Sequence, residues 1–410
     1  MLTPIAAKAA RLFSTTTRAA AATDVVIVSA ARTPIASFNG ALSTVTAPEL
    51  GSVAIKEVLA RANLSPDEID EVYMGNVVSA MVGQAPTKQA TLGAGIPNTV
   101  PCTGINKVCA SGMKSVMMAA QSIMLGQQGI MLAGGFESMS KIPFYLARGS
   151  AGFGHGKIVD GMIHDGLWDP YDDQHMGNCA EDCAKRYGFS REDQDAYAIE
   201  SYRRAAEASN AGRFVDEITP VTIKMRGKEV VVEVDQEFSN IKAEKIPTLR
   251  PAFQKDGTVT AANASSINDG ACAMALMSAD AAAARGLKPL ARIRGFGDAA
   301  QEPIQFTTAP AKAVPIALKM AGVELTDIDY HEINEAFSVV ALANMQLMNL
   351  DHSKVNVNGG AVALGHPIGC SGARIITTLI QVLKQNDATL GTASICNGGG
   401  GASAIVIERL

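Results

Sequence analysis

Val108-Cys109-Ala110-Ser111-Gly112-Met113-Lys114 opens an apolar run that predicts a helix over residues 111–126, and a buried strand with a glycine-rich end follows at 129–135. Near the C-terminus, Gly369-Cys370-Ser371-Gly372-Ala373-Arg374 leads a second such helix before a glycine-ended strand at 392–399. The distance from Ser-Gly to the glycine cluster is similar in both copies. This order predicts the internal duplication of one α/β unit, whose matched helix starts and strand ends converge on one central site.

The other elements of the two halves alternate as they do in α/β proteins. Residues 24–31 are a β-branched run that predicts a buried parallel strand. Residues 48–62 have helical periodicity, and residues 70–77 hold a further strand. The sequence alone therefore predicts an α/β fold.

Residues 141–265 differ in texture from both halves. They contain a glycine- and histidine-rich loop, a charged helix at 190–212 and a basic, β-rich stretch at 224–250. We expect an insertion whose lysines and arginines meet phosphate groups. An ordinary solvated surface would have a similar composition, so that alternative stays open.

Composition bounds the function classes. With 410 residues, of which 47% are hydrophobic and 18% charged, the chain can build two to three domains. Its net charge of −5 argues against nucleic-acid binding, and no apolar stretch reaches the roughly 18 residues of a membrane-spanning helix. The seven cysteines are odd in number and form no Cys-x-x-Cys pair, so no disulfide framework is expected.

The first 23 residues form a distinct segment. They contain Lys8, Arg11 and Arg18, no acidic residue, and a cluster of serine and threonine at 14–17. These features are typical of a mitochondrial transit peptide and predict that the mature chain works in the mitochondrial matrix. A disordered tail without a targeting role is the alternative.

Cys109 is the first candidate for chemistry. A thiol at a helix start lies near free backbone N–H groups and the positive end of the helix dipole, which predicts a low pKa and a nucleophilic thiolate. A lone cysteine is more often a small buried hydrophobic residue. Four downstream motifs change that balance: Asn334-Glu335-Ala336-Phe337, Asn358-Gly359-Gly360, Gly365-His366-Pro367 and Cys396-Asn397-Gly398.

With Asn106 three residues before Cys109, this set of motifs resembles the thiolase family over residues 24–410, closest to its mitochondrial acetoacetyl-CoA-forming members. The resemblance implies a duplicated α/β fold of two similar βαβ-type halves with mixed sheets, layered α/β/α/β/α. It implies an N-terminal half at 24–140 and 266–288, an inserted coenzyme-A-binding loop domain at 141–265, and a C-terminal half at 289–410.

The resemblance also implies the reaction, a reversible Claisen condensation of two acetyl-CoA molecules to acetoacetyl-CoA and coenzyme A. Cys109 carries the acetyl group, His366 takes the proton of Cys109, and Cys396 removes a proton from the methyl carbon of the second acetyl-CoA. One oxyanion hole uses His366 and a water held by Asn334; the other uses the backbone N–H groups of Cys109 and Gly398. Glycines after Cys396 keep side chains away from those N–H groups.

Ligand positions follow from the same resemblance. It implies coenzyme A contacts at these residues: His175, Met176, Tyr202, Asn240, Ile241, Lys242, Lys245 and Ser265. It implies a potassium ion, held largely by backbone carbonyls, at these: Tyr202, Ala261, Ala262, Ala264 and Val362. No covalently bound cofactor is expected, and the family implies a homotetramer built as a dimer of dimers.

Thr307 bears on the substrate range. It follows Phe306 where relatives that accept 2-methylacetoacetyl-CoA have proline, so cleavage of that branched substrate stays open. So does the direction of the reaction in ketone-body, isoleucine or fatty-acid metabolism. A broad-range 3-ketoacyl-CoA thiolase of β-oxidation is one alternative, and a non-catalytic coenzyme-A- or lipid-binding relative is another. The complete set of Cys109, Asn334, His366 and Cys396 favours a catalyst.

Overall fold

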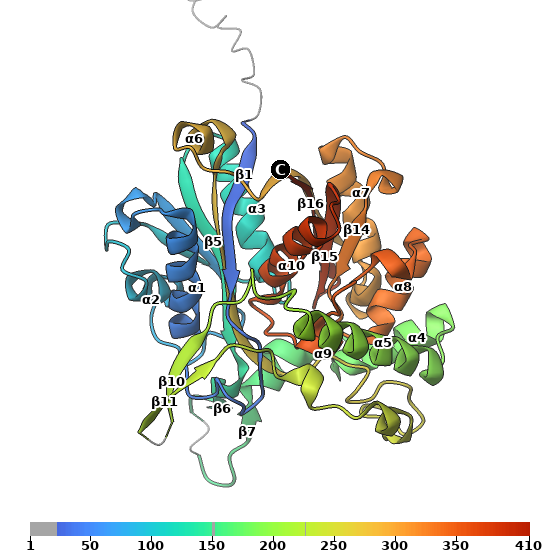
Figure 1. The fold of residues 1–410 in the computed structure, drawn as a ribbon. Coiled ribbons are helices and arrows are strands. Elements are labelled where there is room, and N and C mark those ends of the chain that lie inside the picture. Colours follow the sequence, from blue (N-terminus) through green and yellow to red (C-terminus); the bar gives the residue numbers. More distant parts are fainter. Residues whose placement is uncertain (1–22, 150–151, 226) are drawn as a thin grey trace, which may run out of the picture.

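The computed structural model describes residues 23–149, 152–225 and 227–410, so the predicted transit peptide lies outside the described residues except for Thr23. A sheet of ten strands runs through the molecule in the order β14-β15-β16-β13-β1-β12-β5-β3-β4, with β2 paired to β12 (Figure 1). The strands are β1 Val25–Arg32, β2 Ala36–Ser37, β3 Glu71–Gly75, β4 Cys102–Ile105, β5 Ile130–Ser138, β12 Asn268–Ser278, β13 Ala291–Ala300, β14 Tyr330–Ile333, β15 Leu390–Asn397 and β16 Gly401–Arg409.

The strand order is nearly symmetric because each half repeats one pattern. In the N-terminal half β3 is parallel to β5 and β5 is antiparallel to β12; in the C-terminal half β14 is parallel to β15 and β15 is antiparallel to β16. β12 then pairs with β1, and β16 pairs with β13. The halves join where β1 pairs antiparallel with β13. The predicted duplication is confirmed.

Helices lie on both faces of each half of the sheet (Figure 1). α1 (Ala47–Ala62) and α2 (Pro86–Gly93) cover the outer face of the N-terminal half, and α7 (Pro310–Ala321) and α8 (Ser338–Met348) cover that of the C-terminal half. α3 (Ser111–Met124) and α10 (Ser371–Gln385) pack together between the halves. This α/β/α/β/α arrangement confirms the predicted fold class.

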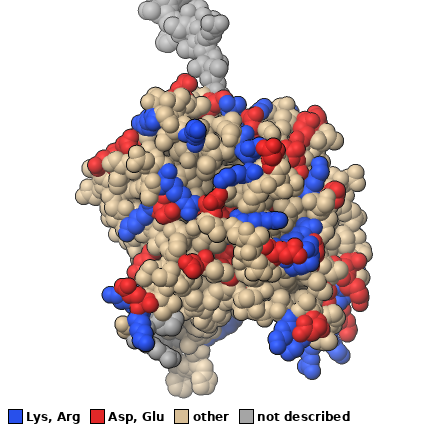
Figure 2. Space-filling model, in the orientation of Figure 1, with Lys and Arg blue, Asp and Glu red and all other residues tan. Residues whose placement is uncertain are grey.

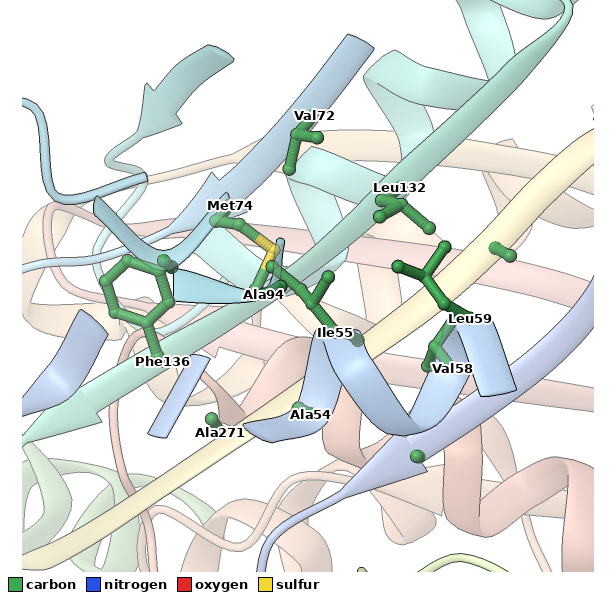
Figure 3. Close-up of a cluster of buried hydrophobic side chains, with 14 of the residues drawn as sticks. Ala54, Ile55, Val58, Leu59, Val72, Met74, Ala94, Leu132, Phe136 and Ala271 are labelled. Atoms are coloured by element: carbon green, nitrogen blue, oxygen red, sulfur yellow. The ribbon is translucent and has the colours of Figure 1, made fainter. Parts of the chain in front are cut away.

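α1 shows how local sequence defines an element. Thr46 caps its start by accepting from the backbone N–H of Glu49, whose carboxylate accepts in turn from the N–H of Thr46. Asn63, in the left-handed conformation, ends the helix. Figure 3 shows the apolar face, where Ile55 points toward Met74 of β3 and Leu59 toward Leu132 of β5 in the buried cluster that holds α1 on the sheet.

β1 corrects one prediction. Its eight residues are all buried, but it pairs antiparallel with both neighbours rather than parallel. Val26 and Val28 pack in the core under α1, whereas Val25 and Ile27 pack in the core under α3 and α10. Helices on both faces therefore explain the unbroken apolar run that had indicated a parallel strand.

The region between the halves consists of short elements. They are β6 Phe144–Leu146, β7 Ile158–Asp160, a π-helical turn Ile163–Leu167, β8 Trp168–Asp169, β9 Gln174–His175, α4 Met176–Tyr187, α5 Arg191–Asn210, β10 Val221–Met225 and β11 Lys228–Val232. The predicted charged helix is α5. The stretch at 224–250 is β-rich only as far as Val232, because the residues beyond are mostly polar and include Pro247, which lacks an N–H for a strand ladder. Two short helices complete the fold, α6 Ala279–Ala284 and α9 Ala361–Leu364.

The charged surface is mixed in sign. Figure 2 shows lysine and arginine interspersed with aspartate and glutamate over one face. Within the described ranges, no helix is both long enough and apolar enough to cross a membrane.

Candidate active site

A cavity of about 820 Å³, including its open mouth, is lined by residues from both halves. Cys109 comes from the turn before α3, His366 from the loop before α10, and Gly398 from the turn after β15. Much of the remaining wall is apolar: Met139, Leu167, Phe253, Phe306, Phe337 and Ile368. The predicted convergence of the duplicated helix starts and strand ends is therefore present at this cavity.

Cys109 follows a strained turn. Val108 has a φ of +49°, which is unusual for a β-branched residue and is held in place by its surroundings. The side chain of Asn106 accepts from the Val108 N–H at 3.0 Å, and Ser111 Oγ accepts from the Lys107 N–H at 2.8 Å. These bonds present the half-buried Cys109 to the cavity.

The predicted low pKa of Cys109 is wrong. Burial raises the pKa of this thiol to about 12, although the backbone N–H groups of Gly398 and of Cys109 itself act in the opposite direction. The apolar wall outweighs the two N–H groups because it cannot solvate a thiolate. Cys109 is consequently a neutral thiol that needs a base to become nucleophilic.

His366 lines the same cavity as Cys109 and presents a neutral imidazole there. Its Nδ1 lies 2.6 Å from Ser371 Oγ, and Ser371 Oγ also donates to the carbonyl of Pro367 at 3.0 Å. Ser371 therefore accepts from Nδ1–H, which leaves a lone pair on Nε2. Burial lowers the pKa of His366 to about 3, so the imidazole is neutral at physiological pH. Ser371 is not among the site residues predicted from the sequence; its signal is its place in the duplicated Ser-Gly pair.

Asn334 and Cys396 lie behind the cavity wall. Asn334 Nδ2 is 3.4 Å from His366 Nε2, and the buried Asn334 Oδ1 has no hydrogen-bond partner among the described residues. Such an atom needs a donor, as an ordered water would supply. Cys396, at the end of β15, packs in an apolar cluster with Met176 and Phe337, where burial and the neighbouring Cys109 raise its pKa.

Glu335 fixes the chain beside Asn334. Its buried carboxylate accepts four hydrogen bonds: from Tyr197 Oη, Ser201 Oγ and Asn356 Nδ2, each at 2.8 Å, and from the Val362 N–H at 3.0 Å. Because these donors come from α5, α9 and the loop before α9, Glu335 links the Asn334 segment to the chain that leads into His366. Glu335 is a further residue of the site that the sequence did not predict.

Glycine follows Cys396 for two different structural reasons. Gly399 and Gly400 both have a φ of +81°, and a Cβ on Gly400 would collide with the carbonyl of Gln301. A Cβ on Gly398 would instead meet side-chain atoms of Val108 and Met176 at 3.6 and 3.7 Å, which is ordinary contact. Glycine is required by backbone geometry at the later two positions, whereas at Gly398 it leaves the cavity side of the chain open.

The predicted coenzyme A residues fall in two places. His175, Met176 and Ser265 line the cavity, and His175 Nδ1 caps α4 by accepting from the Gly177 N–H at 3.0 Å. The others lie outside the cavity lining: Tyr202, Asn240, Ile241, Lys242 and Lys245. Of these, Asn240, Lys242 and Lys245 are exposed, whereas Tyr202 and Ile241 pack in an apolar cluster.

The predicted potassium residues lie around one turn. Tyr202, Ala262 and Val362 pack in the same cluster, and Ala264 lines the cavity. In the part of the chain that the structure describes, no backbone N–H donates to the carbonyls of Ala261, Ala262 or Ala264. Free carbonyl oxygens on one turn fit a hard monovalent cation.

Two thiols, an imidazole and an amide gathered at the meeting point of two α/β halves define a cysteine-dependent enzyme. The family model for the thiolase N-terminal domain matches residues 25–280, and that for the thiolase C-terminal domain matches residues 287–409. The chain belongs to the thiolase family.

Relatives and solved structures match over most of the chain. It is 57% identical to the mitochondrial acetyl-CoA acetyltransferase of Rattus norvegicus over 94% of this chain and 91% of that protein. It is 53% identical to the acetyl-CoA acetyltransferase of Schizosaccharomyces pombe, over 95% and 99% respectively. The crystal structure of the Acat5 thiolase from Ascaris suum in complex with coenzyme A has a TM-score of 0.90 and 48% identity, covering 94% of this chain and 100% of that one.

Proposed function

We propose that this chain condenses two acetyl-CoA molecules to acetoacetyl-CoA and coenzyme A, and catalyses thiolysis in reverse. The observation that carries the proposal is the single cavity lined by Cys109, His366 and Gly398, with Cys396 and Asn334 behind its wall. The names of the relatives, acetyl-CoA acetyltransferase, support the same reaction.

The first half-reaction transfers an acetyl group to Cys109. His366 Nε2 takes the thiol proton while the sulfur attacks the thioester carbonyl; the bond from carbonyl carbon to coenzyme A sulfur then breaks, and the proton leaves with that sulfur. The N–H groups of Cys109 and Gly398 both act on Cys109 Sγ, which supports an oxyanion hole for the carbonyl oxygen beside it.

The second half-reaction forms the carbon–carbon bond. The thiol of Cys396 first gives its proton to His366 Nε2, and the resulting thiolate removes a proton from the methyl group of the second acetyl-CoA. The enolate carbon attacks the acetyl carbon on Cys109, whose bond to sulfur breaks, and the Cys109 thiolate takes the proton back from His366. A thiol whose pKa is raised by burial gives a thiolate that is a stronger base, which suits a weakly acidic carbon. While His366 holds the Cys396 proton on Nε2, that N–H and Asn334 Nδ2, whose nitrogens are 3.4 Å apart, donate to the enolate oxygen directly or through water.

The ligand positions and cellular setting are part of the proposal. Coenzyme A runs past His175, Met176 and Ser265, with its phosphates toward the exposed Lys242 and Lys245. Potassium is held by the free carbonyls of the 261–264 turn. We also propose that the chain divides into an N-terminal half, an inserted loop domain and a C-terminal half, and that it forms a homotetramer. We propose that it acts in the mitochondrial matrix after removal of residues 1–23. Relatives named mitochondrial support this location.

Thr307 stands outside the cavity lining, beside a residue that belongs to it. The side chain is buried and bonds Cys183, while its neighbour Phe306 lines the cavity. Thr307, which stands where those relatives have proline, therefore lies behind the part of the cavity wall that would face the acyl group. We propose that 2-methylacetoacetyl-CoA remains a substrate.

A thiolysis assay tests the proposed function. Acetoacetyl-CoA, 2-methylacetoacetyl-CoA and a ten-carbon 3-ketoacyl-CoA are compared with and without potassium. We expect acetoacetyl-CoA to be cleaved fastest and potassium to raise the rate. Faster cleavage of the ten-carbon substrate would instead establish the broad-range alternative.

The pH dependence of the first half-reaction follows from the neutral Cys109 thiol and the neutral His366 imidazole. An ordinary histidine loses its base function below about pH 6.5, whereas His366 stays unprotonated down to its pKa of about 3. We therefore expect the single-turnover rate of Cys109 acetylation to vary little between about pH 5 and pH 8. A fall centred near the ordinary histidine pKa, measured by release of coenzyme A, contradicts this.

A further inference from the structure

The geometry points to Lys107 and Asp298 as positioning residues that set the spacing between Cys109 and Cys396. Both stand outside the cavity lining, and the inference rests on the proposed two-thiol reaction. It concerns how the nucleophile of the N-terminal half is held in register with the base of the C-terminal half.

Lys107 crosses from one half to the other. It lies two residues before Cys109, and its Nζ is 2.6 Å from Asp298 Oδ1 on β13. The same ammonium group donates to the carbonyl of Ala402 at 3.0 Å and to Ser403 Oγ at 2.7 Å, both on β16. Three acceptors use all three of its donors, so its position is defined.

The acceptor on Ala402 ties this lysine to the second thiol. Ala402 lies directly opposite Cys396 in the antiparallel β15–β16 ladder. Its neighbour Ser403 lies opposite Asp298 in the β13–β16 ladder. One ammonium group therefore connects the residue two before Cys109 with the residue facing Cys396.

Asp298 holds the ammonium group in place. Its Oδ1 accepts from Ser403 Oγ at 2.6 Å, and its Oδ2 is 2.6 Å from the ammonium nitrogen of Lys114 in α3. Burial opposes ionisation of this carboxyl, but the hydrogen bonds from Lys107, Lys114 and Ser403 outweigh it and lower the pKa of Asp298 to about 2. The side chains of Lys107 and Asp298 are 24% and 36% exposed, so the ion pair adds little to stability.

The strained turn explains why such a link is needed. Val108, with its φ of +49°, stands between Lys107 and Cys109, and a strained residue relaxes when its supports are removed. The spacing of Cys109 and His366 has an independent support, because the starts of α3 and α10 touch through Gly112 and Gly369. Loss of Lys107 consequently affects the pairing of Cys109 with Cys396 more than its pairing with His366.

The test separates the two half-reactions in the full chain. In Lys107→Met and Asp298→Asn we expect acetoacetyl-CoA formation to fall by about 10- to 100-fold at saturating acetyl-CoA, as a misplacement near 1 Å would cause. Mass spectrometry follows the acetylation rate of Cys109. We expect this rate and the KM for acetyl-CoA to stay within about threefold of the values of the parent protein. Lys107→Arg, which keeps the charge, recovers part of the rate.

Lys384→Met is the matched control, because Lys384 makes an ion pair of the same type with Asp216 at 2.8 Å on the surface. It keeps both rates, and all variants keep the thermal midpoint of the parent. An equal loss in both half-reactions, or no loss of condensation in either Lys107→Met or Asp298→Asn, overturns the inference. A parent protein that acetylates Cys109 but never condenses refutes the proposed function instead.

Discussion

Replacing Cys396 by serine lowers acetoacetyl-CoA formation by about 100- to 10,000-fold, the range typical of a lost general base, while Cys109 is still acetylated. Cys396 is buried in an apolar cluster and its pKa is raised with Cys109 as a neighbour, so it suits proton removal from carbon. A serine hydroxyl is far less acidic and cannot take that role at neutral pH. Acetylation needs only Cys109, His366 and the N–H of Gly398.

The measurement combines product formation with trapping of the acetyl-enzyme. In Cys396→Ser the acetyl label accumulates on Cys109 because the second half-reaction no longer removes it. Cys183→Ser is the control, because Cys183 is a buried thiol of the same apolar cluster; it keeps condensation within about threefold. Condensation at the parent rate in Cys396→Ser rules out the proposed division of labour between the two thiols.

The sequence predicted well those features of the fold that depend on a local pattern of residues. The Ser-Gly helix starts and glycine-ended strands repeat in the chain, and the structure shows the corresponding duplication in β3-β5-β12 and β14-β15-β16. Cys109 precedes the first of the repeated helices by two residues, and His366 precedes the second by five. Their meeting in one cavity follows from the repeat.

What the sequence could not predict depends on contacts between distant segments. β1 looks parallel because its burial is complete, yet burial on both faces says nothing about the direction of its neighbours. Cys109 looks activated by its helix start, but the apolar wall that raises its pKa is assembled mostly from other elements. Lys107 reads as an ordinary surface charge until β13 and β16 are placed beside it.

The second large effect concerns Gly372, where the two central helices begin against each other. A Cβ on Gly372 would lie 2.5 Å from the backbone nitrogen of Met113, and a Cβ on Gly112 would lie 2.9 Å from the carbonyl oxygen of Gly369. These neighbours are backbone atoms of buried elements, so they cannot move aside as a side-chain tip can. The close approach explains why both copies of the repeat have glycine after serine.

Gly372→Val should therefore lower the free energy of unfolding by about 3 kcal/mol or more, at the upper end of overpacking effects. A urea unfolding midpoint measures this. Gly104→Val is the control, because a Cβ on Gly104, in edge strand β4, would meet only Thr87 Oγ1 at 3.4 Å. Since the same contact sets Cys109 against His366, any Gly372→Val protein that folds should also acetylate Cys109 slowly. If Gly372→Val had normal stability and normal acetylation, the starts of α3 and α10 could separate without loss of unfolding free energy. Another contact would then have to hold Cys109 and His366 in one site.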